Sequence, residues 1–422
     1  MDRRRNPYTP NAGARPPALV GRDAQLDDFA ILLDRLRNGY AEQSLLVTGL
    51  RGVGKTVLLG AFEERARAAG WVTVDAEITK NVEFGPRIAG LVRRALFQLA
   101  PRVRWKDRAT RAARTLKSFQ LTVSPTGIVT AGLDIEALEG MADSGELADD
   151  MTDLLVALGE AAQEHETGVV FLLDEIQFLA TVELEALISG LHKTVQRQLP
   201  VTLVGAGLPQ LPRLAGEAKS YAERLFKFPE IGRLDAGQAA RALVEPAQAL
   251  GVEYSRRAIE RIVEYTEGYP YFLQELGKVV WELSEGSPID VAVVEAAQGE
   301  VEASLDESFF RVRTERVTPL ELRYLGAMAQ SGPRAQSAKA VARLLGRTSE
   351  QLGPTRSRLI EKGLLYTPGY GLAAFTVPQF DRFMLRSQLV ERVSDELLEE
   401  VRAAEEREGA AFFPLNASRR VT

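Results

Sequence analysis

The hydrophobic positions in the first half of the chain alternate between helical spacing and short apolar runs. Apolar residues recur at helical spacing over 23–36, and the run 44–48 ends at a glycine. A predicted helix over about 55–69 follows, and the apolar runs 71–78, 169–174 and 201–205 predict three more strands. Strands that alternate with helices form parallel sheets covered on both faces. The pattern therefore predicts an α/β domain with a parallel sheet over residues 20–231.

The segment between the second and third predicted strands, about 90 residues, is longer than one crossover helix requires, which predicts an insertion at about 82–150. It begins with a predicted helix over 86–99 and continues through a basic stretch, 102–117. We interpret that stretch either as a solvated helix face that pairs with the acidic loop 136–150, or as a nucleic-acid contact. Alternating apolar residues over 119–123, a Ser-Pro-Thr-Gly turn and the run 128–135 predict a hairpin, and a helix to about residue 163 follows the acidic loop.

The rest of the chain divides into four further segments. Residues 1–19 hold four prolines and predict an extended arm. Helical spacing over 232–310 predicts a small helical lid domain. Within 311–388, three predicted helices precede two strands joined by a Pro-Gly turn, the order of a winged helix. Residues 389–422 predict an acidic helical tail.

The composition excludes several kinds of chemistry. The chain has no cysteine, so disulfides, thiolate metal sites and cysteine nucleophiles are absent. Its two histidines, His165 and His192, stand apart, and a histidine metal site or triad would lack a third partner. The net charge of −6 restricts any nucleic-acid binding to a local patch. The apolar runs are far below the ~18 residues of a membrane span, so we expect a cytoplasmic protein without membrane contact.

A phosphate-binding motif follows the first predicted strand. Residues 49–56, Gly-Leu-Arg-Gly-Val-Gly-Lys-Thr, match G-x-x-x-x-G-K-[ST] at every fixed position and lie between a strand and a helix. The glycines let backbone N–H groups turn toward phosphates, and the helix N-terminus adds its positive dipole end. We expect Lys55 to contact the β- and γ-phosphates of ATP and Thr56 to bind Mg²⁺. The alternative is a tight strand-to-helix turn without a ligand.

Two carboxylates end the third predicted strand. Asp174 is expected to hold the Mg²⁺ coordination sphere, while Glu175 orients and deprotonates the attacking water. Taken alone, a strand followed by Asp-Glu is equally typical of a helix N-cap. The phosphate motif about 120 residues upstream favours the metal and general-base interpretation.

With these motifs the chain resembles the AAA+ ATPases of the origin-recognition initiator group and the related STAND signalling NTPases. Val20-Gly21-Arg22-Asp23 is similar to the segment that lines the adenine pocket in that class, and Gly268-Tyr269-Pro270 to its Gly-x-Pro element in the lid. The stretches 205–209 and 375–378 look closest to bacterial proteins described only as ATP-binding or AAA ATPase domain proteins. The resemblance implies an AAA+ type P-loop sheet followed by a lid and a winged helix, over about residues 18–385.

The resemblance also implies a set of nucleotide-binding residues. They come from the adenine segment, the phosphate motif and the lid: Val20, Gly21, Arg22, Gly49, Gly52, Val53, Gly54, Lys55, Thr56, Val57 and Pro270. Arg224 lies where the class carries an arginine that senses the γ-phosphate or acts on a neighbouring subunit, and together with Lys55 and Glu175 it forms the candidate catalytic set. A surface ion pair is the alternative for Arg224.

Two features depart from the class. The fourth strand ends Gly205-Ala206-Gly207 where a relative carries Asn, Thr or Ser, and Gln177 or Gln210 could substitute. The helix after Pro270 begins without an arginine. Both departures favour a slow ATPase or a switch over a fast motor.

The predicted winged helix carries local positive charge. Residues 333–363 hold seven basic and two acidic residues, a net of +5. A recognition helix would present Arg356 and Arg358, with Lys362 on phosphates of double-stranded DNA. Winged helices also contact protein, and fold does not decide between these uses.

We therefore predict a slow Mg²⁺-dependent ATPase that acts as a nucleotide-controlled switch with DNA as its output ligand. The alternatives are a STAND-like signalling or assembly switch, whose winged helix contacts a protein partner or a second copy, and an ATP-binding regulator that hardly hydrolyses.

Overall fold

The structure is a computed structural model of the 422-residue chain, and it describes all residues except 81, 100–104, 124–134, 388, 390–392 and 413–422. The chain divides into two compact units, residues 1–294 and 295–422, each described by itself below.

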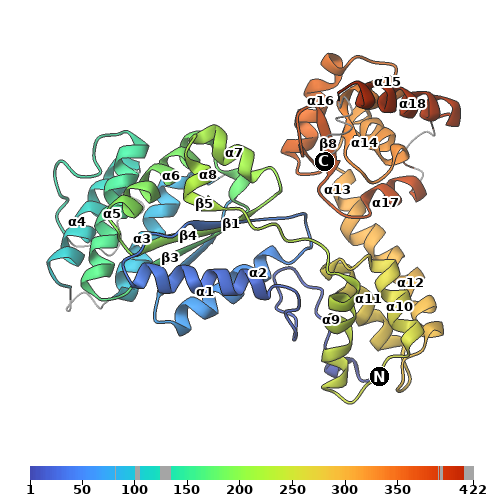
Figure 1. Cartoon of the computed structure of the whole chain (residues 1–422), viewed down its shortest axis with the longest axis horizontal. Coiled ribbons are helices and arrows are strands. Elements are labelled where there is room, and N and C mark those ends of the chain that lie inside the picture. The colour runs from blue at the N-terminus through green and yellow to red at the C-terminus, as the bar shows by residue number, and fades with distance from the viewer. Residues whose placement is uncertain (81, 100–104, 124–134, 388, 390–392, 413–422) are drawn as a thin grey trace, which may run out of the picture. The chain divides into compact units, whose positions relative to one another are not determined.

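The first unit is built on a five-stranded parallel sheet (Figure 1). Its strands are β1 (Ser44–Thr48), β2 (Val72–Glu77), β3 (Val169–Asp174), β4 (Val201–Gly207) and β5 (Phe226–Lys227), in the spatial order β2-β3-β4-β1-β5. All four pairings are parallel. The α/β prediction is confirmed, and β5, two residues long, was not predicted. The order places the ends of β1 and β3, which carry the candidate site, on either side of β4.

Helices cover both faces of this sheet, as Figure 1 shows. On one face lie α1 (Asp23–Arg37) and α2 (Lys55–Ala68), packed on Leu45 and Val47 of β1. On the other lie α3 (Phe84–Leu99), α4 (Asp107–Val123), α5 (Leu147–Glu164), α6 (Thr181–Gln196) and α7 (Leu211–Ala218), and Leu46 points to this face. Successive side chains of a strand point to opposite faces of the sheet, and both faces are covered by helices. The strands are therefore continuously apolar.

A hairpin was predicted over 119–135, and its first strand, residues 119–123, is wrong. Helix α4 continues to Val123, and residues 124–134 lie outside the described part of the chain. Ala109, Ala112, Leu116 and Phe119 are buried at helical spacing, whereas Leu121 is 45% exposed. The apparent alternation at the end of the segment was therefore the last turn of an amphipathic helix, whose period governs which side chains the core receives.

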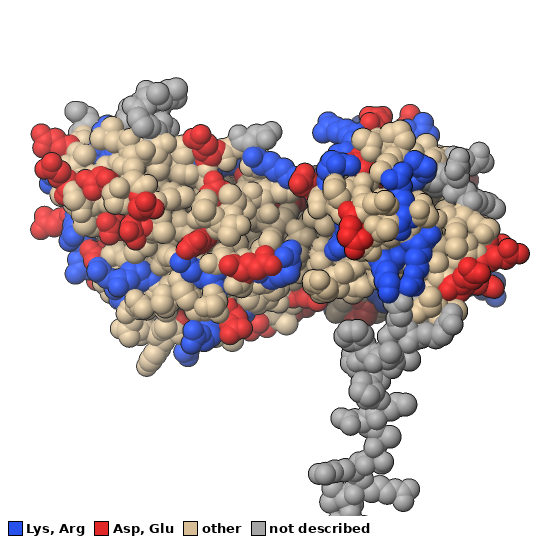
Figure 2. Space-filling view, turned by 90° about the horizontal axis from the view of Figure 1, so that it is seen from above, with Lys and Arg blue, Asp and Glu red and all other residues tan. Residues whose placement is uncertain are grey.

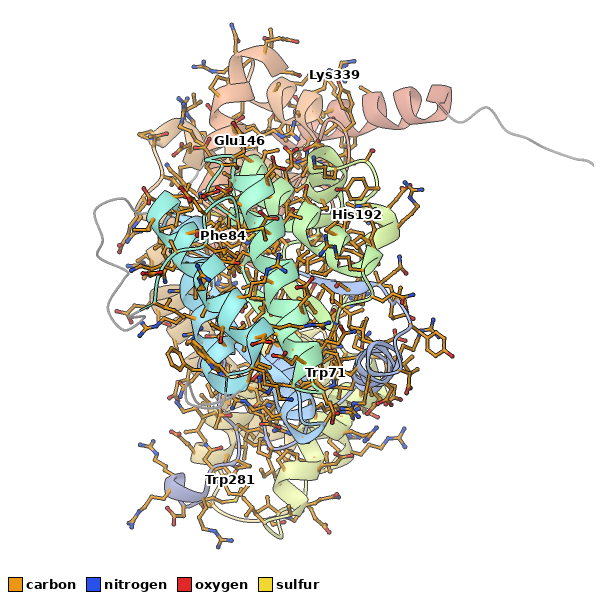
Figure 3. The ribbon with its side chains drawn as sticks, turned by 90° about the vertical axis from the view of Figure 1, so that its left-hand side faces the viewer. Trp71, Phe84, Glu146, His192, Trp281 and Lys339 are labelled. Carbon is orange, nitrogen blue, oxygen red and sulfur yellow. The ribbon has the colours of Figure 1, made fainter. Side chains whose placement is uncertain are left out.

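Four helices follow the sheet: α9 (Ala236–Gln248), α10 (Arg256–Thr266), α11 (Pro270–Leu283) and α12 (Val291–Ser304), the last of which crosses the boundary between the two units. The arm before α1 runs back along α11. The Tyr8 ring lies against Gly277, and its hydroxyl hydrogen-bonds the Leu243 carbonyl at 2.6 Å and the Tyr254 hydroxyl at 2.8 Å. Trp281 lies beside the first turn of the chain, η1 (Arg3–Arg5), and donates to the Asp2 carbonyl (Figure 3).

The second unit combines short helices with a three-stranded antiparallel sheet. After the π-helical turn η4 (Leu305–Arg311) and α13 (Val312–Thr314) come α14 (Pro319–Ser331), β6 (Gln336–Ser337), α15 (Ala338–Leu344), α16 (Ser349–Glu361), β7 (Leu365–Tyr366) and β8 (Leu372–Phe375). Helices α17 (Phe380–Arg386) and α18 (Asp395–Phe412) complete it, and Phe310 stacks on Phe383 in its core. The three predicted helices and two strands are present, while β6 and α17 were not predicted. Among the described residues, none of the helices has the length and apolarity that crossing a bilayer requires.

Candidate nucleotide site

The phosphate motif forms a turn between β1 and α2 that only glycine permits at two positions. Gly54 has a φ of 90°, a left-handed conformation that side chains disfavour. A Cβ on Gly49 would lie 2.3 Å from the carbonyl oxygen of Ile231. The glycines therefore allow both the backbone turn and the close approach of the segment that leads away from the sheet.

Lys55 begins α2 and is almost buried, with 7% of the residue exposed. Its Nζ donates to the carbonyl oxygens of Gly49 and Leu50, both at 2.9 Å. Burial lowers the pKa of Lys55 to about 8, although Glu175 and Asp174 counteract part of that effect. A buried ammonium that the local carboxylates do not fully compensate is suited to an added anion.

Thr56 and Asp174 meet at the same point. The Thr56 hydroxyl donates to Oδ2 of Asp174 at 2.6 Å, although the two residues are 118 positions apart in sequence. One is at the start of α2 and the other at the end of β3, and the parallel sheet brings these ends to one edge. Hydroxyl and carboxylate oxygens are the donors that Mg²⁺ prefers. This pair therefore fits the expected metal position.

Glu175 is held by Gln177, one of the two glutamines named as substitutes for the missing polar residue after the fourth strand, and by Arg51, which had no predicted role. Its backbone is left-handed, with a φ of 53°, and its carboxylate accepts a hydrogen bond from the side-chain amide of Gln177. The amide oxygen of Gln177 accepts from the backbone N–H of Leu208 at 3.1 Å, just beyond β4. Arg51 approaches the carboxylate to 4.0 Å. Gln177 thus links Glu175 to the strand whose end lacks a polar side chain.

The segment predicted to line the adenine pocket, Val20, Gly21 and Arg22, joins the phosphate turn to the start of the helices that follow the sheet in sequence. Arg22 is only 6% exposed, and its guanidinium donates to the carbonyls of Val53 at 3.0 Å and Gly232 at 2.8 Å. Burial lowers its pKa. Val20 is buried as well. Arg22 therefore ties the phosphate turn to the start of the helical segment, a structural contact that sequence reasoning missed.

Helix α11 begins over the phosphate turn. Pro270 occupies its first turn, and the backbone N–H of Tyr271 donates to the Gly52 carbonyl at 3.2 Å. Gly268 has a φ of 72°, and a Cβ there would lie 2.2 Å from the Leu234 carbonyl oxygen. The Gly-Tyr-Pro element thus sets the position of α11 on the turn. Tyr271 was not predicted, and its place after Pro270 was the only available signal.

The N-terminal arm also reaches the site. After Tyr8 docks on α11, the chain brings Gly13 so close to Thr56 that a Cβ there would lie 3.4 Å from the Thr56 methyl group. Arg15 then pairs with Glu64 of α2. The arm therefore connects α11 to α2 past the candidate metal position.

The remaining predicted residues are less closely joined to this site. Val57 follows Thr56 in α2 and is half-buried. Arg224 is exposed on the short helix α8 (Ala222–Leu225), and within the described residues no hydrogen bond or ion pair connects its side chain to Lys55, Asp174 or Glu175. Its role stays a prediction.

In the second unit, the three residues predicted to contact DNA have partners within the fold. The buried Glu321 carboxylate accepts from Arg358 Nε at 3.0 Å and Lys362 Nζ at 2.5 Å. Arg356 donates to Thr367 Oγ1 at 3.2 Å and to the Leu372 carbonyl at 2.7 Å. Arg358 and Lys362 remain 48% and 31% exposed, which allows contact with a phosphate while they are paired.

Comparison with known proteins agrees with this architecture. Residues 18–204 match the family model described as the AAA ATPase domain, and residues 307–384 match a domain of unknown function. The fold is that of an AAA+ P-loop NTPase. The ORC2 protein of Aeropyrum pernix, solved in its ADP form, is 16% identical with a TM-score of 0.50, over 96% of this chain and 98% of that one. A Walker-type ATPase of Pyrococcus abyssi is 14% identical with a TM-score of 0.50, over 88% and 97%.

A third similar structure is the RuvB Holliday junction branch migration motor of Thermotoga maritima, 18% identical with a TM-score of 0.42, over 85% of this chain and 95% of that one. No curated protein matches the chain. An AAA ATPase domain implies nucleotide binding together with a metal ion, typically Mg²⁺.

Proposed function

We propose that the chain binds ATP with Mg²⁺ at the β1–α2 turn and hydrolyses it slowly, acting as a nucleotide-controlled conformational switch. The observation that carries the proposal is the 2.6 Å contact of Thr56 with Asp174 beside the buried Lys55. Thr56 and Asp174 are the residues that would hold Mg²⁺, and Lys55 and the backbone N–H groups of the turn would hold phosphates. Bound Mg²⁺ supplies positive charge that stabilises charge developing on the phosphates.

The switch part of the proposal rests on the contacts between the phosphate turn and the helical segment. Tyr271 donates to Gly52, and Arg22 bridges Val53 and Gly232. A nucleotide that moves the turn changes these contacts, and it shifts the position of the helices only by its different affinity for the two arrangements. ATP and ADP differ at the γ-phosphate, so a residue at that position, such as Lys55, is the means of discrimination.

Slow hydrolysis is supported by the surroundings of Glu175. A general base must reach the attacking water, directly or through one other water. Here the carboxylate already accepts a hydrogen bond from Gln177, and Arg51 is 4.0 Å away. The hydrogen bond from Gln177 competes with a water for the carboxylate oxygens, so we expect a low rate constant for the chemical step.

The test is ATP binding and single-turnover hydrolysis by the wild type and by Glu175→Gln. The proposal expects equal ATP affinity and at least a hundredfold loss of hydrolysis in the variant, because general-base catalysis typically contributes 10²–10⁴-fold. The matched control is Glu185→Gln, a substitution on α6 that removes the ion-pair partner of Lys219. This variant is expected to retain the wild-type rate of hydrolysis. Hydrolysis that does not require Glu175 would contradict the catalytic part, and ATP that fails to bind would contradict the whole proposal.

We propose double-stranded DNA as the output ligand of the second unit, through a winged helix formed by α14 to β8. The order helix, strand, two helices, two strands supports that description. Six exposed basic residues lie in this part of the chain: Arg323, Arg334, Lys339, Arg347, Arg358 and Lys362. Figure 2 shows basic side chains gathered over the second unit on the face that it draws. Because Arg358 and Lys362 are already paired with Glu321, they would contact phosphates rather than base edges.

Duplex binding at two salt concentrations tests this output. A phosphate-dominated interaction loses affinity steeply as salt rises, and Arg358→Gln reduces the salt slope by about one contact. Arg256→Gln, which removes an exposed arginine of α10, is the charge-matched control. A DNA affinity that changes neither with salt concentration nor with the Arg358 substitution would instead favour the alternative switch, in which the winged helix contacts a protein partner or a second copy of the chain.

A further inference from the structure

A pocket of about 500 Å³ lies in the second unit, apart from the nucleotide site. It is bounded by the start of α15, the first half of α16, the loop before β8 and one side chain of α14. This size lies within the range of small-molecule sites, about 300–1,000 Å³. Neither the proposed ATP site nor the phosphate contacts proposed for DNA require such a cavity.

Two polar groups at this pocket lack partners among the described residues. Tyr324 of α14 lines the pocket and is fully buried, and its hydroxyl has no hydrogen-bond partner. Arg356 of α16 also lines it, and its buried Nε–H is unpaired although its Nη2 is satisfied by Thr367 and Leu372. Buried polar groups in folded proteins are almost always paired with protein, water or ligand. Both groups are therefore positioned to serve something that enters the pocket.

The lining determines the kind of ligand that fits. Arg356 and Lys339 are cationic, Tyr324 and Ser349 add hydroxyl groups, and the lining includes no carboxylate. Figure 3 shows Lys339 on the outer side of this unit. The remaining walls include the apolar side chains of Leu352 and Leu372. Such walls favour an organic ligand with an apolar body and a negatively charged end that accepts hydrogen bonds.

We propose that this pocket binds a small organic anion, a carboxylate or a phosphate monoester, through Tyr324 and Arg356. The anionic group accepts hydrogen bonds from the Tyr324 hydroxyl and the Arg356 Nε–H, and the apolar body lies against Leu352 and Leu372. A DNA backbone phosphate uses the same donors but would leave the apolar walls uncovered, so the small molecule is the better fit. The proposal is independent of the proposed ATPase activity, because none of these residues belongs to the phosphate turn.

The experiment titrates the full chain with para-fluorobenzoate, para-fluorophenyl phosphate and neutral para-fluorobenzyl alcohol, followed by fluorine NMR. Wild type is expected to bind at least one of the two anions saturably and at least tenfold more tightly than the alcohol. Tyr324→Phe removes only the hydroxyl and is expected to weaken that binding about tenfold, as loss of a hydrogen bond to a charged group does. Arg356→Gln is expected to weaken it by at least as much.

Three controls separate this pocket from other anion sites. Arg334→Gln changes an exposed arginine of the same unit that does not line the pocket and leaves binding unchanged. Lys55→Met leaves it unchanged as well, which distinguishes the pocket from the phosphate turn. Thermal unfolding of each variant establishes that the second unit is folded, and Leu352→Trp, which fills the pocket, abolishes binding without removing a charge.

The proposal is overturned if neither anion binds saturably at millimolar concentration, since ordered water then satisfies the two donors. It is also overturned if the alcohol binds as well as the anions, or if Tyr324→Phe and Arg356→Gln both bind normally. Displacement of the bound probe by duplex DNA, with affinity lost in the same two variants, would assign these residues to a DNA surface instead.

Discussion

The buried Lys55 makes ATP binding dependent on pH in a range that is easy to measure. The pKa of its ammonium is about 8 because burial disfavours the charged form, compared with 10.5 for an exposed lysine. If only the charged form binds the phosphates, the competent fraction is about 0.9 at pH 7 and about 0.09 at pH 9. ATP affinity should therefore fall about tenfold over these two units and continue to fall above pH 9. The terminal phosphate is ionised throughout this range and contributes no opposing change.

Equilibrium titration of the protein with a fluorescent ATP analogue between pH 7 and 9.5 measures this effect. Lys55→Arg is the matched control, because a guanidinium keeps its charge throughout, and its affinity should be independent of pH. Circular dichroism at each pH establishes that the fold is intact. Wild-type affinity that stays constant to pH 9 would refute the reasoning, and so would a parallel decline in the arginine variant.

Three further predictions concern residues around the site and in the second unit. Gln177→Met removes the amide that engages Glu175; we expect single-turnover hydrolysis to rise several-fold at unchanged ATP affinity, and a fall would mean that the amide orients the carboxylate instead. Tyr8→Ala removes the buried ring that docks the arm; thermolysin, which cleaves before apolar residues, should then cut the arm within residues 9–19 much faster than in the wild type, and an unchanged cleavage rate would show that the arm is held elsewhere. Burial alone would raise the pKa of Glu321, but hydrogen bonds from Lys362, the Thr318 N–H and Arg358 lower it to about 2. The unfolded state therefore binds the extra proton between about pH 4.5 and 2, and stability is lost as pH falls through that window. In Glu321→Gln, the number of protons taken up on unfolding in that window should fall by about one, so the free energy of unfolding should depend less on pH there. A pH profile parallel to that of the wild type would contradict the assignment.

The sequence was most informative where one pattern served both local structure and chemistry. The phosphate motif required a strand before it and a helix after it, and β1 and α2 have those positions. Asp174 was recognised because it ends an apolar run, and the parallel sheet then brings it to Thr56. In contrast, Gln177 and Arg22 act through contacts with Leu208 and Gly232, which are distant in sequence. No local pattern marks such contacts, since they depend on how the elements pack.

Misinterpretation of 119–123 has a similar origin. Three alternating apolar residues fit a strand over a short window, but helix α4 is recognised only when Ala109 to Phe119 are taken together. Likewise, the charge of Arg358 and Lys362 was visible in the sequence, whereas their shared pairing with the buried Glu321 carboxylate, which offsets one of the two charges, was not. Positive charge along a chain therefore overestimates the charge that a folded surface offers to a partner.

The docked arm has a consequence for how the protein is made. Gly277, on which the Tyr8 ring rests, is synthesised 269 residues after Tyr8 itself. At about 5–20 residues per second, the arm waits about 13–54 s for its partner. All five strands and the phosphate turn are complete before that moment, since β5 ends at Lys227. During translation the nascent sheet can therefore meet nucleotide while the arm is still undocked, and closure of the arm past Thr56 becomes one of the last steps in forming the first unit.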